Sequence, residues 1–171
     1  MNTFTKSVSI LSLAIFASSL HASEGWFGKA GVARFSESEA GVNLDLDAIF
    51  VGGGYSFKVA ENFYIAPEIR FAKGIGSEDI FGVDVEIDTA WFAGVRGILK
   101  ADSGLFGFVS AGYGDISIDA SMGSVSESAS ADDIGFGAGF GYEFNQKFAL
   151  ELGFEDYDGT DVVQLGANFR F

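Results

Sequence analysis

The stretch that decides the fold is Ile134-Gly135-Phe136-Gly137-Ala138-Gly139-Phe140-Gly141-Tyr142-Glu143-Phe144. Every second residue is apolar, and all but one of the residues between them are glycine. Successive side chains of a β-strand point to opposite faces. This pattern therefore predicts a strand with one apolar face and one face that is nearly free of side chains. Alternation alone does not say which face is inside.

The same alternation recurs along the rest of the chain. Eight segments of roughly ten residues are bounded by turn residues, and no helical periodicity follows the first 22 residues. The segments are Trp26–Phe35, Ala48–Phe57, Phe63–Lys73, Val83–Lys100, Leu105–Ile118, Ile134–Phe144, Phe148–Tyr157 and Asp161–Phe171. A soluble barrel would have to stack the phenylalanines in a narrow interior, whereas a membrane barrel turns them toward lipid. We therefore expect an all-β, eight-stranded, antiparallel, up-and-down transmembrane β-barrel.

The N-terminus has the features of an export signal. Lys6 supplies a positive charge, residues 8–20 form an apolar segment, and Leu20-His21-Ala22 is a plausible cleavage site. We expect a signal peptide at residues 1–22 and a barrel domain at residues 23–171, with no further domain after it. The expected location is the cell outer membrane of a Gram-negative bacterium.

The links between the segments alternate in length. Lys58–Asn62, Ala101–Gly104 and Asn145–Lys147 are short, which is typical of periplasmic turns. The alternate links are mostly longer, as outer loops are, and they lie near Ser36–Asp47, Gly74–Gly82, Ser117–Asp133 and Asp156–Thr160. The Ser, Ala and Gly content of Ser117–Asp133 predicts a mobile loop.

Composition excludes several functions. A formal net charge of −14 argues against nucleic acid as a partner, because phosphate requires a basic surface. The chain has no cysteine, and its single histidine, His21, lies in the expected signal peptide. Nucleophilic triads and histidine-bound zinc are therefore not expected. Asp132 and Asp133 fall in the serine-rich link with no expected pocket, so we expect neither an enzyme nor a cofactor.

Three stretches carry a resemblance to a known family. They are Gly25-Trp26-Phe27-Gly28, Phe136-Gly137-Ala138-Gly139-Phe140-Gly141-Tyr142 and Leu165-Gly166-Ala167-Asn168-Phe169-Arg170-Phe171. With them the mature chain resembles outer-membrane β-barrels related to the outer membrane protein A-like transmembrane domain. The alternating residues Leu165, Ala167, Phe169 and Phe171 resemble the signal that the barrel-assembly machinery reads in this family. The resemblance therefore implies that machinery as a partner.

Charged residues at membrane depth are expected to point into the lumen, because lipid-facing charge is costly. By parity the set is Lys29, Glu68, Arg70, Arg96, Glu143, Glu151, Glu155 and Arg170. One interpretation is a salt-bridged plug, since eight strands enclose just enough space for side chains. The other is a narrow, gated, cation-preferring pore that opens when a pair such as Glu151 and Arg170 exchanges partners.

Acidic residues gather in the expected outer loops and strand ends, with only Arg34 and Lys73 nearby to offset them. They are Glu37, Glu39, Asp45, Asp47, Glu78, Asp79, Asp84, Glu86, Asp88, Asp115, Asp119, Glu127, Asp132, Asp133, Asp156, Asp158 and Asp161. Such a rim could keep the loops soluble, gather divalent cations that bridge lipopolysaccharide, or attract a basic partner. The segment Asp156–Asp161 resembles half of a calcium loop, but its Asp-Gly pair is also a hairpin signal.

Six aromatic residues could suggest a stacking site, but girdles at the membrane interfaces explain most of them more simply. They are Trp26, Trp91, Tyr64, Tyr113, Tyr142 and Tyr157. Two functions remain: a structural and surface-interaction barrel in contact with outer-membrane lipid and lipopolysaccharide, or a small cation-preferring pore.

Overall fold

The computed structural model describes residues 24–39, 42–80, 82–122 and 125–171, so the expected signal peptide lies outside the described residues. Within those ranges, no helix has the length and apolar character needed to cross a membrane.

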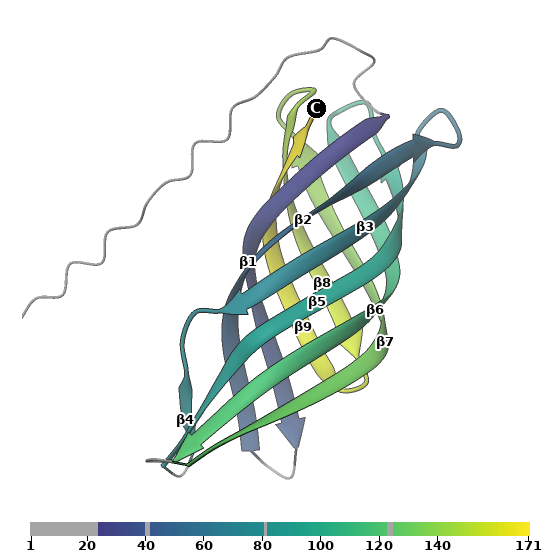
Figure 1. Ribbon diagram of the computed structural model, residues 1–171. Coiled ribbons are helices and arrows are strands. Elements are labelled where there is room, and N and C mark those ends of the chain that lie inside the picture. The colour runs from purple at the N-terminus through teal and green to yellow at the C-terminus, as the bar shows by residue number, and fades with distance from the viewer. Residues whose placement is uncertain (1–23, 40–41, 81, 123–124) are drawn as a thin grey trace, which may run out of the picture.

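The described residues form one antiparallel sheet that closes on itself (Figure 1). Its strands are β1 (Gly25–Glu39), β2 (Val42–Lys58), β3 (Phe63–Gly74), β4 (Glu78–Ile80), β5 (Val83–Lys100), β6 (Leu105–Met122), β7 (Val125–Glu143), β8 (Phe148–Tyr157) and β9 (Thr160–Arg170). Apart from β3 and β4, strands that follow one another in the chain pair with each other, β1 pairs with β9, and β3 pairs with β5 to complete the ring. The short strand β4 pairs only with β5 among the described strands, so the expected eight-stranded barrel is confirmed.

The predicted faces of the deciding strand are confirmed on β7. Ile134, Phe136 and Phe140 are exposed on the outer wall, whereas Gly135 and Gly141 are buried. Barrel closure leaves a lipid-facing band of apolar side chains and pairs the backbone groups between neighbouring strands, as a bilayer requires.

Aromatic rings also fill the inside, although the alternation predicted that the phenylalanines turn toward lipid. Tyr64 and Tyr157 are buried in the lumen, so their assignment to the interface girdles was wrong. Both lie on the inward parity of their strands, together with Glu68 on β3 and Glu155 on β8. The other buried rings are Phe27, Phe35, Phe50, Phe92, Phe106 and Phe108.

Inward glycines make room for these rings. A Cβ atom on Gly139 would collide with the Phe108 ring, and one on Gly135 would collide with the Tyr157 ring. In the same way, a Cβ atom on Gly141 would collide with the Phe106 ring, and one on Gly114 would collide with the Phe92 ring. The bare face of β7 is thus the surface against which the lumenal rings pack.

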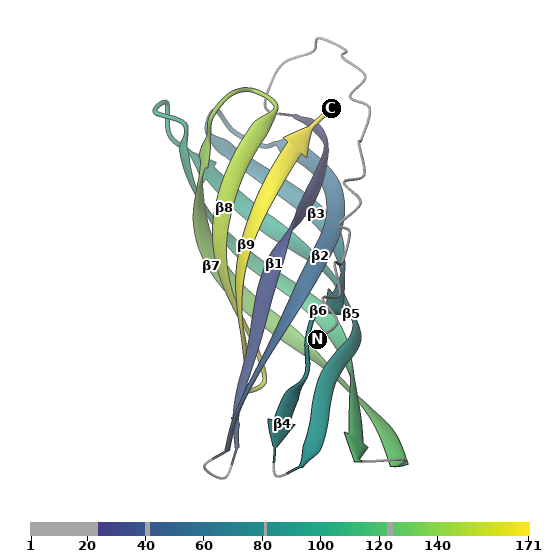
Figure 2. The ribbon, with the colours of Figure 1, turned by 90° about the vertical axis from the view of Figure 1, so that its left-hand side faces the viewer.

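The expected mobile loop Ser117–Asp133 was wrong. β6 runs to Met122, β7 begins at Val125, and the two strands pair continuously from Met122↔Val125 to Leu105↔Tyr142. Small residues that cannot fill a core are tolerated here because an unbroken antiparallel ladder pairs the backbone groups of β6 and β7 that face each other. The paired strands extend past the β8–β9 turn (Figure 2).

Residues Asp156–Asp161 form a hairpin rather than a calcium loop. Tyr157 pairs with Thr160 across the turn, and Asp158 and Gly159 both have positive φ, at 44° and 97°. Two consecutive left-handed residues of the Asp-Gly type are the usual solution for a two-residue β-hairpin.

We predict that Gly139→Ala destabilises the barrel by about 1–3 kcal/mol, because the added methyl group overpacks the lumen against Phe108. Gly107→Ala is the matched control, since its Cβ would meet only the Gly139 carbonyl oxygen, at 3.8 Å. Urea unfolding in lipid vesicles measures both variants. Equal stabilities would mean that the lumen tolerates extra volume.

Candidate functional site

A layer of charged side chains crosses the middle of the lumen. Six of the predicted residues meet there, all of them buried, from β1, β3, β5 and β8: Lys29, Glu68, Arg70, Arg96, Glu151 and Glu155. Three are cations and three are carboxylates, so the central layer carries no net charge. We call these six residues the central layer.

Glu68 bridges all three cations of the layer. Its carboxylate oxygens lie 3.3 Å from Lys29 Nζ, 3.3 Å from Arg70 Nε and 3.3 Å from Arg96 Nη1. Glu151 binds two of the same cations, with Lys29 Nζ at 2.7 Å and Arg96 Nη2 at 2.9 Å. Because each carboxylate is shared, removing any one of these side chains disturbs several pairs.

Glu155 completes the layer toward the outside. Arg70 donates to both of its oxygens, at 2.9 and 2.7 Å, and the Tyr157 hydroxyl donates to it at 3.1 Å. Gln164 accepts a hydrogen bond from Arg70 at 2.6 Å, and Asn168 donates to Glu151 at 2.8 Å. Gln164 and Asn168 occupy inward positions of β9, but their partners depend on the three-dimensional register.

Two apolar clusters enclose the central layer. The outer cluster includes Phe35, Leu46, Phe50, Ile87, Phe92 and Tyr157. The inner cluster includes Phe27, Tyr64, Ile98, Phe106 and Phe108. Arginines of the central layer reach into both, because Arg70 lies 5.1 Å from the Phe92 ring centroid and Arg96 lies 3.6 Å from that of Phe108. Cation–π contacts of this kind stabilise a partly desolvated guanidinium.

The last two predicted charges lie at the periplasmic end. Arg170 donates to Glu143, and Lys100 Nζ lies 2.8 Å from the same carboxylate. The hypothesis of a gating pair between Glu151 and Arg170 does not match this geometry. Glu151 pairs with Lys29 and Arg96, while Arg170 pairs with Glu143, because the β8–β9 register sets Glu151 opposite Gly166, four residues from Arg170.

Two spaces beside the central layer are small. One cavity beside Arg70 and Ser110 has a volume of about 10 Å³, and one between Ser56 and Asn168 has a volume of about 30 Å³. A cavity needs roughly 10–15 Å³ to hold a single water molecule. A larger cavity, of about 180 Å³, lies at the outer mouth.

The residues of the predicted assembly signal lie on the outer face of β9 and at its end. Leu165, Phe169 and Phe171 are exposed, and Ala167 is half-buried. The backbone N–H of Phe171 donates to the Trp26 carbonyl at 3.1 Å, which ties the C-terminal residue to β1.

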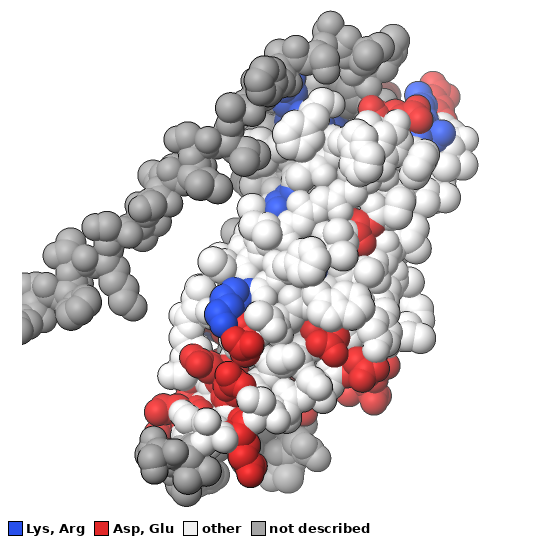
Figure 3. Space-filling model, viewed as in Figure 1, with Lys and Arg blue, Asp and Glu red and all other residues white. Residues whose placement is uncertain are grey.

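The outer acidic residues have few cationic neighbours. Arg34 donates to Asp47 at 2.8 Å and 3.0 Å, and this hydrogen bond lowers the pKa of the Asp47 carboxyl. Lys73 pairs with Asp88 at 2.5 Å. Figure 3 shows acidic side chains gathered over the lower end of the view, around β4 and the outer ends of the neighbouring strands. In the part of the chain that the structure describes, no three acidic residues form a group that could hold a metal ion.

Comparisons with solved structures agree with this architecture. Ail, the attachment invasion locus protein of Yersinia pestis, matches with a TM-score of 0.65 and 20% identity over 86% of this chain and 99% of that one. A second structure of Ail, in complex with the heparin analogue sucrose octasulfate, gives a TM-score of 0.64 at 20% identity, over the same shares. Neisserial surface protein A matches with a TM-score of 0.58 and 14% identity over 86% and 97% of the two chains. No curated protein sequence matches the chain.

A closed barrel of eight tilted strands with a lipid-facing apolar wall defines an outer-membrane protein. The chain belongs to the family of outer membrane protein β-barrel domains, whose model matches residues 7–171. It is therefore a protein of the outer membrane.

We predict that Glu151→Gln lowers the free energy of unfolding by about 3–5 kcal/mol, because it leaves Lys29 and Arg96 undercompensated in the lumen. The double variant Lys29→Met/Glu151→Gln removes one charge of each sign and should recover part of that loss. Urea unfolding in lipid vesicles, followed by tryptophan fluorescence, measures both.

Asp47→Asn serves as the control for this series, since it breaks an exposed pair at the outer surface and should leave stability unchanged. A Glu151→Gln variant as stable as the wild type would contradict a stabilising role for the central layer.

Proposed function

We propose that this protein is a non-conducting, non-enzymatic barrel that presents an acidic sheet to basic polypeptide segments at the cell surface. The observation that carries the proposal is the pairing of β6 with β7 far beyond the point where β8 ends. We call the outer ends of β5, β6 and β7 the acidic sheet: residues 83–90, 115–121 and 126–135.

The open edge of β7 supports a binding role for this sheet. β8 pairs with β7 only from Phe136 to Glu143, so residues 126–135 have a strand neighbour on one side alone within the described chain. An exposed strand edge offers unpaired N–H and C=O groups to an extended peptide, which can add as a further strand. Figure 2 shows this pair of strands reaching beyond the β8–β9 hairpin.

Charge selects the kind of partner. The acidic sheet carries Asp84, Glu86, Asp119, Glu127 and Asp133, and its strands have no lysine or arginine within those ranges. The relative Ail has been solved with a heparin analogue, a polyanion. Like charge disfavours such a ligand here, whereas a lysine- or arginine-rich segment is complementary to the sheet.

The layered lumen supports the non-conducting part of the proposal. A hydrated ion would have to pass two apolar clusters and a central layer with shared salt bridges. The two spaces described beside the central layer, of about 10 and 30 Å³, have room for roughly one and two water molecules.

The test is binding of a fluorescent lysine-rich peptide to the protein in lipid nanodiscs. We expect salt-sensitive binding that falls roughly tenfold, or about 1.4 kcal/mol, in Asp84→Asn/Asp119→Asn/Glu127→Gln. Glu61→Gln/Asp102→Asn is the matched control, because those acids lie on periplasmic turns and should not affect binding.

Three outcomes of these experiments would overturn the proposal. One is equal peptide binding by the sheet variant and its control, and another is tighter binding of heparin than of the peptide. The third is a series of discrete openings of the wild-type protein in a planar bilayer, which would favour the cation-preferring pore.

We also propose that residues 1–22 direct export and that the barrel-assembly machinery reads Leu165, Ala167, Phe169 and Phe171. Lipopolysaccharide and divalent cations bridging it are the proposed neighbours of the acidic rim.

We predict that Phe171→Ala lowers the amount of folded barrel in the outer membrane of cells, while the purified variant still refolds into detergent. Phe144→Ala, an exposed ring at the same end, should leave both unchanged. A Phe171→Ala protein assembled at the wild-type level would contradict the assembly role.

A further inference from the structure

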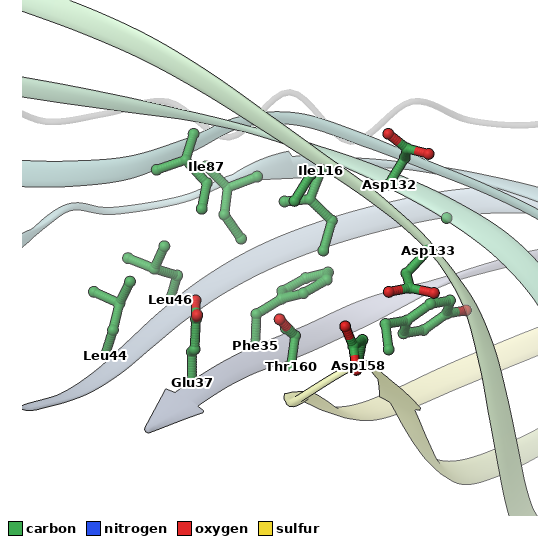
Figure 4. Close-up of a pocket in the computed structure, with 14 residues that line it drawn as sticks. Phe35, Glu37, Leu44, Leu46, Ile87, Ile116, Asp132, Asp133, Asp158 and Thr160 are labelled. Carbon is green, nitrogen blue, oxygen red and sulfur yellow. The ribbon is translucent and has the colours of Figure 1, made fainter. Parts of the chain in front are cut away.

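The cavity at the outer mouth of the lumen differs from the spaces below it. Its volume is about 180 Å³, and residues from β1, β2, β5, β6, β7 and the β8–β9 hairpin line it (Figure 4). It lies above the outer apolar cluster and is separated from the central layer by that cluster. Because the β8–β9 hairpin is short, the barrel wall beside the cavity is lower on that side than along β6 and β7.

The floor of the cavity is apolar and aromatic. Phe35, Leu46, Ile87 and Tyr157 are buried members of the outer cluster that also face the cavity, and Ile116 packs against them. An apolar cavity of about 150 Å³ in another protein accommodates one benzene molecule, so this floor has room for a single ring.

The wall of the cavity is acidic. The carboxylates of Glu37, Asp133 and Asp158 come from three separate strands or turns, and Figure 4 shows them beside the apolar floor. Asp132 is directed the other way and accepts a hydrogen bond from Tyr113 on the outer face. None of the fourteen residues that line the cavity is a lysine or arginine.

We propose that this cavity binds a small aromatic ammonium ion. The ring rests on the Phe35 and Tyr157 side of the floor, and the cationic group faces Glu37, Asp133 and Asp158. Two forces favour this class of ligand over a neutral ring or an inorganic cation. Burial of the ring removes apolar surface from water, while the carboxylates and the aromatic faces both attract an organic cation. The cavity shares Asp133 with the acidic sheet, but its apolar floor and the carboxylates of Glu37 and Asp158 carry this inference separately.

The probe for the test is benzyltrimethylammonium, whose charge is permanent. Calorimetric titration into protein-loaded zwitterionic nanodiscs, with empty nanodiscs subtracted, measures its binding. Tetramethylammonium lacks the ring and benzyl alcohol lacks the charge, and each should bind at least roughly tenfold more weakly.

One variant tests whether the ligand occupies the cavity volume, and a second tests whether the carboxylates attract its charge. Ala131→Phe places a ring in the cavity from a position that already lines it and is exposed, so it should abolish binding without disturbing the core. Ala129→Phe, on the same face of β7 two residues further out, is the matched control and should bind normally. Glu37→Gln/Asp133→Asn should weaken the cation roughly tenfold and leave benzyl alcohol unchanged.

The proposal is overturned if Ala131→Phe binds the cation as tightly as Ala129→Phe does. It is also overturned if the charge variant is unaffected, or if benzyl alcohol binds as well as the cation. The sheet variant Asp84→Asn/Asp119→Asn/Glu127→Gln should retain the cation, so failure of the cavity and failure of the acidic sheet are distinguishable.

Discussion

The constraint on which the rest of the structure depends is the width of an eight-stranded barrel. Every second residue of each strand points into a lumen that has room only for side chains, so inward volume must be matched across the barrel. The glycines of β7 and the rings of Phe106, Phe108 and Tyr157 satisfy this constraint together. A larger residue in place of one of these glycines would displace the ring that packs against it. This explains why glycines and aromatic residues occupy facing positions in the lumen.

The same narrowness governs the electrostatics. Charges that are kept from lipid have no space to remain hydrated inside, so they are stable only when each finds partners of opposite sign. Glu68 and Glu151 each serve more than one cation, and Gln164 and Asn168 supply further hydrogen bonds. The apolar clusters above and below then limit access of water to these pairs.

Much of the architecture could be predicted from the sequence because strand parity is a local property. The segment from Ile134 to Phe144 predicted which residues share a face, and the inward direction of Arg96 and Glu151 followed from parity together with the cost of charge in lipid. Depth is not local for strands that are far apart in the chain, because it depends on their tilt and register, so the contact between Arg70 and Gln164 could not be predicted. The pairing expected between Glu151 and Arg170 was wrong because the β8–β9 register sets Glu151 opposite Gly166, four residues from Arg170. The girdle position of Tyr157 was wrong because this residue shares the inward parity of Glu155. The ladder of Ser117–Asp133 was missed because small, polar residues have weak strand preference until a partner strand is present.

The exact balance of the central layer has an electrical consequence. A voltage across a membrane does work on a charge that moves through it, about 2.3 kcal/mol per elementary charge for each 100 mV. Lys29, Arg70 and Arg96 are matched by Glu68, Glu151 and Glu155, so the layer as a whole feels no net force along the barrel axis. A change in potential can therefore polarise the layer but cannot drive it as a unit toward either side, and the central layer lacks the net charge on which voltage sensors depend.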